Sequence, residues 1–136
     1  TVRDLLGLKT EVVGVVADAA PAYALSFAAG QLVSTNSAAT FADGIAVREP
    51  SEEAFAIIKA GASRILRLTD DEIAEAIRIY YRDTHNLAEG AGAAPLAGLM
   101  RERKSLQGQK AAVILCGGNI DAPVFSQVLA GITPKV

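Results

Sequence analysis

The feature that most constrains the fold is an apolar run, residues 111–115, that is followed by a double glycine at Gly117 and Gly118. Consecutive aliphatic side chains without polar alternation are typical of a strand buried on both faces of a parallel sheet. Glycine accepts the backbone angles of a tight turn, and Asp121 with Pro123 favours a helix directly afterwards. A strand, a tight turn and a helix in this order predict an α/β chain, in which ligands bind at the carboxyl ends of the strands.

Two more strands are expected upstream, an apolar run over residues 11–17 and a shorter strand with two arginines over residues 64–68. Thr69 and Glu72 have the spacing of a capping box. The periodicity predicts helices over about 1–8, 22–29, 51–61, 69–83 and 90–103 and after residue 121. This alternation indicates a parallel-sheet, three-layer βαβ domain.

Residues 31–50 show little periodicity. A segment of that length without regular structure inside a compact domain is often functional. A plain surface excursion explains the same pattern equally well, so both interpretations stay open.

Composition and charge argue against nucleic-acid binding and membrane association. The 136 residues suit one domain, and the net charge of −2 is scattered along the chain, which argues against a nucleic-acid interface and a membrane-surface helix. No run of about 18 apolar residues is present, so no membrane span is expected. The single cysteine, Cys116, cannot form an intramolecular disulfide, which is consistent with a reducing cytoplasm.

The chain begins at Thr1, without Met and inside a helical pattern. Three parallel strands that all look like interior strands would leave apolar edges uncovered, and such edges invite aggregation. We therefore expect this chain to be part of a larger protein.

Cys116 at the end of the apolar run is the first candidate site residue. It is interpretable as a thiol beside a ligand, with glycine backbone approaching closely, or as a small buried hydrophobe before a tight turn. A nucleophilic cysteine would need a neighbouring base, and nothing in the sequence brings His85, the only histidine, near it. His85 is most simply a residue at a helix end.

Glu89, followed by Gly90 and Gly92, is the second candidate. A carboxylate in the first turn of a helix is stabilised by the helix dipole, so capping explains it; a site wall with one buried carboxylate is the alternative. The small residues there would let a backbone or a flat ligand approach the helix start. Asp43 and Gly44 form either a turn or a loop laid against a ligand. Metal motifs such as HExxH, the GxGxxG fingerprint and the phosphate loop GxxxxGK are all absent from the sequence.

Taken in order, several segments resemble one family. They are GVVA at 14–17, APAY at 20–23, TFADGIAV at 40–47, TDDEI at 69–73, EGAGAA at 89–94 and CGGNID at 116–121. Together they resemble the serine/threonine dehydratases, which are pyridoxal-phosphate (PLP) enzymes of fold type II, a group that includes serine racemases. Each motif alone is weak, but six in the right order are specific.

The resemblance implies a tryptophan synthase β-like fold in which residues 1–136 are the C-terminal part of the large PLP-binding domain. The small domain, the Schiff-base lysine and the glycine-rich loop for the cofactor phosphate would then lie in a missing N-terminal half, and this chain alone would be inactive. The resemblance further implies an amino-acid substrate, a homo-oligomer (dimer or tetramer) and a cytoplasmic location.

The family pattern also assigns cofactor-binding roles. It has Ser or Cys where Cys116 stands, as hydrogen-bonding partner of the pyridine nitrogen, and it lets Gly44 pass close to the ring. Glu89 matches an acidic residue on the same side of the cofactor, while Gly117 and Asn119 shape the turn that aims Cys116. A neutral thiol does not force protonation of the ring nitrogen, which favours loss of the β-hydroxyl over transamination.

The implied reaction is α,β-elimination, which converts L-threonine or L-serine to a 2-oxo acid and ammonia. Serine racemases carry a divalent-cation site where this chain has Val16, Ala20 and Ala22, so no metal is expected. The chain also ends soon after CGGN, so no C-terminal regulatory domain and no feedback control by isoleucine are expected. A racemase, a lyase for another hydroxyamino acid such as 3-hydroxyaspartate, and a non-catalytic α/β module that binds a ligand or partner remain the alternatives.

Overall fold

The computed structural model describes residues 2–136, so the Thr1 end of the helix expected over 1–8 lies outside the described residues. The elements in chain order are α1 (Val2–Leu5), β1 (Val13–Ala17), α2 (Ala22–Ala29), the 3₁₀ turn η1 (Asp43–Ile45), α3 (Glu52–Gly61), β2 (Arg64–Leu68), α4 (Asp70–Ile79), the π-helical turn η2 (Tyr80–Thr84), α5 (Gly90–Glu102) and α6 (Ala122–Leu129). Within these described residues, no helix has both the length and the apolar composition needed to cross a membrane.

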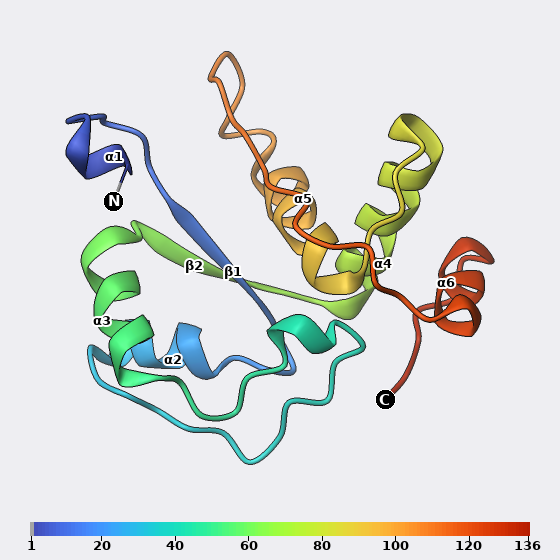
Figure 1. Cartoon of the computed structure of the whole chain (residues 1–136), viewed down its shortest axis with the longest axis horizontal. Coiled ribbons are helices and arrows are strands. Elements are labelled where there is room, and N and C mark those ends of the chain that lie inside the picture. Colours follow the sequence, from blue (N-terminus) through green and yellow to red (C-terminus); the bar gives the residue numbers. More distant parts are fainter. Residues whose placement is uncertain (1) are drawn as a thin grey trace.

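Two parallel strands form the sheet, with β1 and β2 paired in register from Val13–Arg64 to Ala17–Leu68. Figure 1 shows them running between α2 and α3 on one side and α4 and α5 on the other, so the chain has three layers. Helix α5 approaches the sheet closely at Gly98, where an added Cβ would lie 2.9 Å from Val15 Cγ1. Only a residue without a side chain lets the helix sit this low on the strands.

The core is small and rich in alanine. Its largest fully buried apolar side chains are Leu68, Ile73, Ile77 and Val128, and the remaining buried members come mainly from α4 and α5. Small side chains on facing helices let their backbones approach, so the core gains from close packing rather than from bulky residues.

The local signals read from the sequence are confirmed at several helix ends. The Thr69 N–H donates to Glu72 Oε2 at 2.8 Å and the Glu72 N–H donates to Thr69 Oγ1 at 3.3 Å, which completes the expected capping box. The Ser51 hydroxyl accepts from the Ala54 N–H at the start of α3, and Gly30 ends α2 with a φ of 68°.

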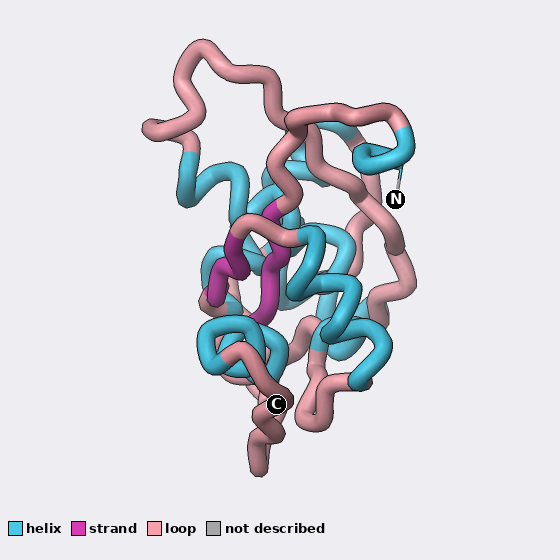
Figure 2. The backbone as a smooth tube through the Cα atoms, turned by 90° about the vertical axis from the view of Figure 1, so that its left-hand side faces the viewer, coloured by secondary structure: helices cyan, strands magenta, loops and turns pink. Residues whose placement is uncertain are grey.

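The prediction of a third strand over residues 111–115 is wrong. This segment forms no strand, and Ile114 is 75% exposed rather than buried on both faces. The strands drawn in magenta in Figure 2 are β1 and β2. A strand needs a partner backbone, and β1 and β2 pair with each other while no other part of residues 2–136 pairs with this run. The helix after it is confirmed as α6, although Asp121 occupies its N-cap position without a side-chain capping hydrogen bond.

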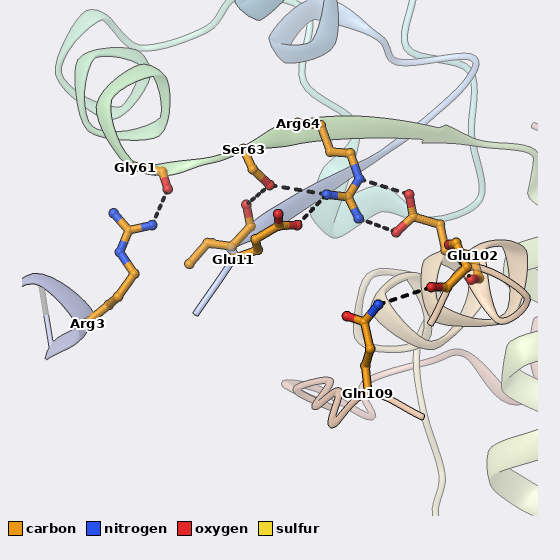
Figure 3. A network of polar contacts seen from close by, with 9 residues as sticks. Arg3, Glu11, Gly61, Ser63, Arg64, Glu102 and Gln109 are labelled. Carbon is orange, nitrogen blue, oxygen red and sulfur yellow. Dashed lines mark hydrogen bonds and ion pairs between the residues drawn. The ribbon is translucent and has the colours of Figure 1, made fainter. Parts of the chain in front are cut away.

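A network of charged side chains lies at the amino end of the sheet (Figure 3). The Arg64 guanidinium donates to Glu102 at 2.9 and 2.6 Å and to Glu11 at 2.8 Å. The hydrogen bonds from Arg64 hold the pKa of Glu102 below its ordinary value, and those to Glu102 and Glu11 raise the pKa of Arg64. Arg3 joins the same region by donating to the Gly61 carbonyl at 2.7 Å, which ties α1 to the end of α3.

Candidate functional site

The start of α5 meets the turn after residue 115 through backbone contacts. The Glu89 N–H donates to the Gly117 carbonyl at 3.1 Å. An added Cβ at Gly92 would lie 2.5 Å from that same carbonyl oxygen, so any side chain at residue 92 would force the turn away from the helix. Gly118 is similarly constrained, because a Cβ there would lie 2.7 Å from the Leu87 carbonyl oxygen. Glycine is required here for close approach rather than for unusual backbone angles.

The carboxylate of Glu89 lies at the centre of the predicted site. Its Oε2 accepts the Asn119 N–H at 3.0 Å, and Cβ atoms added at Gly117 and Gly44 would lie 2.5 and 3.8 Å from its Oε1. The side chain is half-buried, and Glu89 forms no ion pair within residues 2–136. Although Glu89 occupies the N-cap position of α5, its side chain makes no capping hydrogen bond. The geometry therefore favours the site-wall interpretation over capping.

The loop that carries Gly44 packs against the same helix end. A Cβ added at Gly90 would lie 2.7 Å from the Cα of Ala42, and a Cβ added at Gly44 would lie 2.8 Å from the Cβ of Ala91. The small residues in the first turn of α5 thus allow the backbone of another segment to approach closely. A close backbone approach is one of the two possibilities expected from the sequence, the other being a flat ligand. Four of the predicted residues, Gly44, Glu89, Gly117 and Asn119, come together in this way at the carboxyl end of the sheet.

Cys116 precedes this turn with an exposed, free thiol. Its interpretation as a buried hydrophobe is wrong, because the segment that carries it lies outside the two-stranded sheet. His85 is confirmed as a helix-end residue: it follows the π-helical turn η2 with a φ of 56° and is exposed.

Two residues of the site region were missed from the sequence. The Thr40 hydroxyl donates to Asp70 Oδ1 at 2.6 Å, and the Phe41 N–H donates to Asp70 Oδ2 at 3.4 Å. From the sequence, Asp70 belongs to the acidic first turn of a helix, and no spacing rule links it to a loop residue 30 positions earlier. The only sequence signal that could have pointed to Thr40 was the motif TFADGIAV at 40–47.

A hollow of about 440 Å³ lies elsewhere, between α4 and the last turns of α5. None of the predicted site residues lines it. On its wall, burial raises the pKa of Glu72, but hydrogen bonds from Arg101 and Thr69 outweigh burial and lower that pKa overall. The carboxylate is thus committed to an ion pair with Arg101 that links the two helices.

Val16, Ala20 and Ala22, which the resemblance aligns with the cation site of serine racemases, are all buried. Within residues 2–136, no group of three or more His, Cys, Asp or Glu side chains is placed to hold a metal ion.

Comparison with known proteins identifies the family. Residues 2–117 match the family described as pyridoxal-phosphate dependent enzyme. The chain belongs to this family. An L-threonine ammonia-lyase of Geobacter sulfurreducens is 38% identical over 118 residues, which cover 87% of this chain and 29% of that protein. The chain spans less than half the length of the curated relatives it matches.

Solved structures agree with this assignment and with the α/β architecture. A T.th. threonine deaminase superposes with a TM-score of 0.81 at 31% identity, over 88% of this chain and 43% of that one. A maize serine racemase superposes with a TM-score of 0.82 at 22% identity, over 95% of this chain and 41% of that one, which shows a shared fold.

The polar groups of this site are suited to bind one edge of the PLP ring. A free thiol at Cys116 is a neutral partner for a ring nitrogen, and the Glu89 carboxylate has a second oxygen, Oε1, that accepts no hydrogen bond within residues 2–136. The glycines beside it present backbone where a side chain would exclude a flat ring. Among the described residues 2–136, no hydrogen bond to the Glu89 side chain comes from a lysine, and Lys59, for example, donates to the Gly30 carbonyl near α2. The residues therefore fit the ring but do not supply a covalent attachment point.

Proposed function

We propose that residues 1–136 form the C-terminal part of the large PLP-binding domain of a longer ammonia-lyase. That full-length protein would convert L-threonine, L-serine or a related hydroxyamino acid to a 2-oxo acid and ammonia. The 38% identity to an L-threonine ammonia-lyase supports this substrate class. The observation that carries the proposal is the convergence of Gly44, Gly117 and Asn119 on the Glu89 carboxylate, next to the exposed Cys116 thiol.

In this proposal, PLP supplies the electron-withdrawing ring that acidifies the α-carbon of the bound amino acid. Cys116 would hold the ring nitrogen through a hydrogen bond from a neutral thiol, which would leave the nitrogen unprotonated. The Gly117 carbonyl and the Asn119 N–H anchor the turn to Glu89, so they fix the direction of the thiol. Gly44 brings loop backbone to the ring, and Glu89 places one negative charge beside it.

The overall reaction is an elimination followed by hydrolysis. The amino acid loses its α-proton to a base and its β-hydroxyl as water, and hydrolysis of the resulting enamine releases ammonia and the 2-oxo acid. The lysine that would bind the cofactor and take the α-proton belongs, in this proposal, to the N-terminal half of the full-length protein, because no hydrogen bond of the site residues within 2–136 involves a lysine. A neutral partner for the ring nitrogen favours this elimination over transamination.

The missing half is also proposed as the main partner of this chain. Large apolar side chains such as Leu5, Ile57 and Ile114 are 84%, 68% and 75% exposed. Exposed apolar surface of this kind is typical of chains that are covered by further protein. We propose that the remainder of the protein covers part of it and that a second copy covers the rest in a homodimer or homotetramer, located in the cytoplasm, where a free thiol such as Cys116 persists.

The test replaces Cys116 in the full-length protein. Cys116→Ser keeps a neutral hydrogen-bonding group and should retain the elimination activity. Cys116→Asp places a carboxylate at the ring nitrogen, keeps that nitrogen protonated and should increase the formation of pyridoxamine phosphate. Oxo-acid production, pyridoxamine phosphate and the absorbance of the bound cofactor are measured for both variants. An Asp variant with the product ratio and spectrum of the wild type would exclude the assigned role of Cys116.

A further inference from the structure

Thr40 and Asp70 connect the irregular segment 31–50 to the helical layer. Thr40 is 4% exposed, and its hydroxyl donates to Asp70 Oδ1 at 2.6 Å. The second carboxylate oxygen accepts the Phe41 N–H at 3.4 Å, and Thr40 Oγ1 itself accepts the Ala42 N–H at 3.2 Å. A short O–H···O⁻ bond to a half-buried carboxylate is among the stronger hydrogen bonds in proteins.

This pair anchors the part of the segment that carries Gly44. Thr40 and Ala42 are the buried residues within 31–50, while most of the others are exposed. Earlier in the segment, the Val33 N–H donates to the Ser26 hydroxyl of α2 at 2.9 Å, so residue 33 is tied to α2 separately. The hydrogen bonds within the turn η1 are local, because the Ile45 N–H donates to the Ala42 carbonyl and the Ala46 N–H donates to the Asp43 carbonyl. Such local bonds shape the turn but do not tie it to the rest of the molecule.

The anchor lies directly before the part of the loop that reaches the site. Ala42 packs against the backbone at Gly90, and two residues later Gly44 lies against Ala91 and near the Glu89 carboxylate. Release of Thr40 from α4 would therefore free the loop at the point that sets the position of Gly44.

We propose that Thr40 and Asp70 are positioning residues, which hold the 41–46 loop so that Gly44 lies against the start of α5 where the cofactor ring is bound. This inference rests on the proposed function, since it gives Gly44 a ligand. Neither side chain reaches Glu89 or Cys116 in any hydrogen bond within residues 2–136, so both act through the loop.

The experiment uses the full-length protein with two isosteric variants, Thr40→Val and Asp70→Asn. Thr40→Ser keeps the hydroxyl and is the conservative variant. Asp71→Asn is the matched control: Asp71 is the next residue of the same first turn, and its carboxylate accepts from the Thr133 hydroxyl instead of from the loop. The control loses the same helix-dipole interaction without touching the anchor.

Two measurements read the outcome. Amide hydrogen exchange of residues 41–46, recorded without cofactor, should be about tenfold faster in Thr40→Val and Asp70→Asn and unchanged in Thr40→Ser and Asp71→Asn, because the charge-assisted hydrogen bond between the loop and α4 is lost only in the first two. Fluorescence titration with PLP should show about tenfold weaker binding in the same two variants.

The possible results separate this inference from the proposed function. Wild-type protein that takes up no PLP contradicts the proposed function itself. If the wild type binds PLP, unchanged exchange in Thr40→Val and Asp70→Asn overturns the anchor. Faster exchange with unchanged PLP affinity overturns the positioning role, and weaker PLP binding in Asp71→Asn would assign the effect to the helix end instead of the loop.

Discussion

Helix α5 has a glutamate at each end, and the two carboxylates are held by different partners. Glu89, before the first turn, accepts the backbone N–H of Asn119 at 3.0 Å. Glu102, in the last turn, receives two hydrogen bonds from the Arg64 guanidinium, at 2.9 and 2.6 Å. A guanidinium neutralises a carboxylate, whereas one backbone N–H leaves its charge in place. The charge at the carboxyl end of the sheet therefore stays available to a ligand, and the charge at the amino end does not.

The two ends of α5 also differ in whether backbones or side chains make the packing contacts. Near Glu89 the contacts are between backbones, because Gly92 and Gly117 bring the helix and the turn together. Near Glu102 the contacts are between long side chains, of which Arg64 is 37% and Glu11 69% exposed. Backbone contacts tolerate no added atoms, whereas exposed ion pairs contribute little and are screened by salt. The carboxyl end should therefore be the more sensitive to substitution.

The largest effect is expected for Gly92→Ala. Its Cβ would lie 2.5 Å from the Gly117 carbonyl oxygen, a backbone atom that cannot rotate away, so the variant should lose about 1–3 kcal/mol of unfolding free energy. Gly61→Ala is the matched helical control: the nearest atom to its Cβ is Arg3 Nη2 at 3.7 Å, and the variant should be stabilised by up to about 1 kcal/mol. Denaturant unfolding of the full-length protein measures both. Equal stabilities of the two variants would show that the turn does not rest on the helix.

The sequence predicted the parts of this fold that depend on neighbouring residues. Capping at Thr69, the helix stop at Gly30 and the strands β1 and β2 all follow from local composition and periodicity. The motif order also predicted the family, which the comparisons confirm. The strand expected over 111–115 failed because apolar composition reports a tendency to be buried, while strand formation also requires a partner backbone.

For the site, the sequence predicted which residues gather but not how they are held. The small residues after Glu89 indicated close approach, and the structure brings the backbone of Gly117 and Ala42 into that space. The hydrogen bond between Thr40 and Asp70 spans 30 positions, so only the folded chain reveals it.

The second largest effect is expected for PLP binding, which should weaken in Glu89→Gln but not in Glu102→Gln. Glu89→Gln keeps an oxygen that accepts the Asn119 N–H, so the unfolding free energy should change by less than about 0.5 kcal/mol. The variant loses the negative charge beside the proposed ring, and PLP affinity should fall about tenfold, which corresponds to about 1.4 kcal/mol. PLP titration followed by fluorescence measures this, with Glu102→Gln as the control at the other end. Equal PLP affinities for the two variants would contradict the assignment of Glu89 to the cofactor site.

The smallest effect is expected for the stability of Glu102→Gln. The hydrogen bonds from Arg64 lower the pKa of Glu102 in the folded protein, so near the ordinary glutamate pKa the unfolded chain binds more protons than the folded one. The stabilisation is then complete above that ordinary pKa, about 4.3, and is lost as the pH falls through the lower pKa of the folded state. At neutral pH the variant should lose no more than about 1 kcal/mol, because the pair is partly exposed.

Chemical unfolding of the wild type and of Glu102→Gln at a series of pH values checks this, with Glu49→Gln as a control at an exposed loop position without an ion pair within residues 2–136. The difference between Glu102→Gln and the wild type should shrink on acidification and also in about 0.5 M salt, where exposed charges are screened over a few ångströms. The control should show neither trend. A difference that persists at low pH would mean that Glu102 stabilises this end of α5 through packing of its side chain rather than through its charge, and the contrast with Glu89 would then no longer be one of charge compensation.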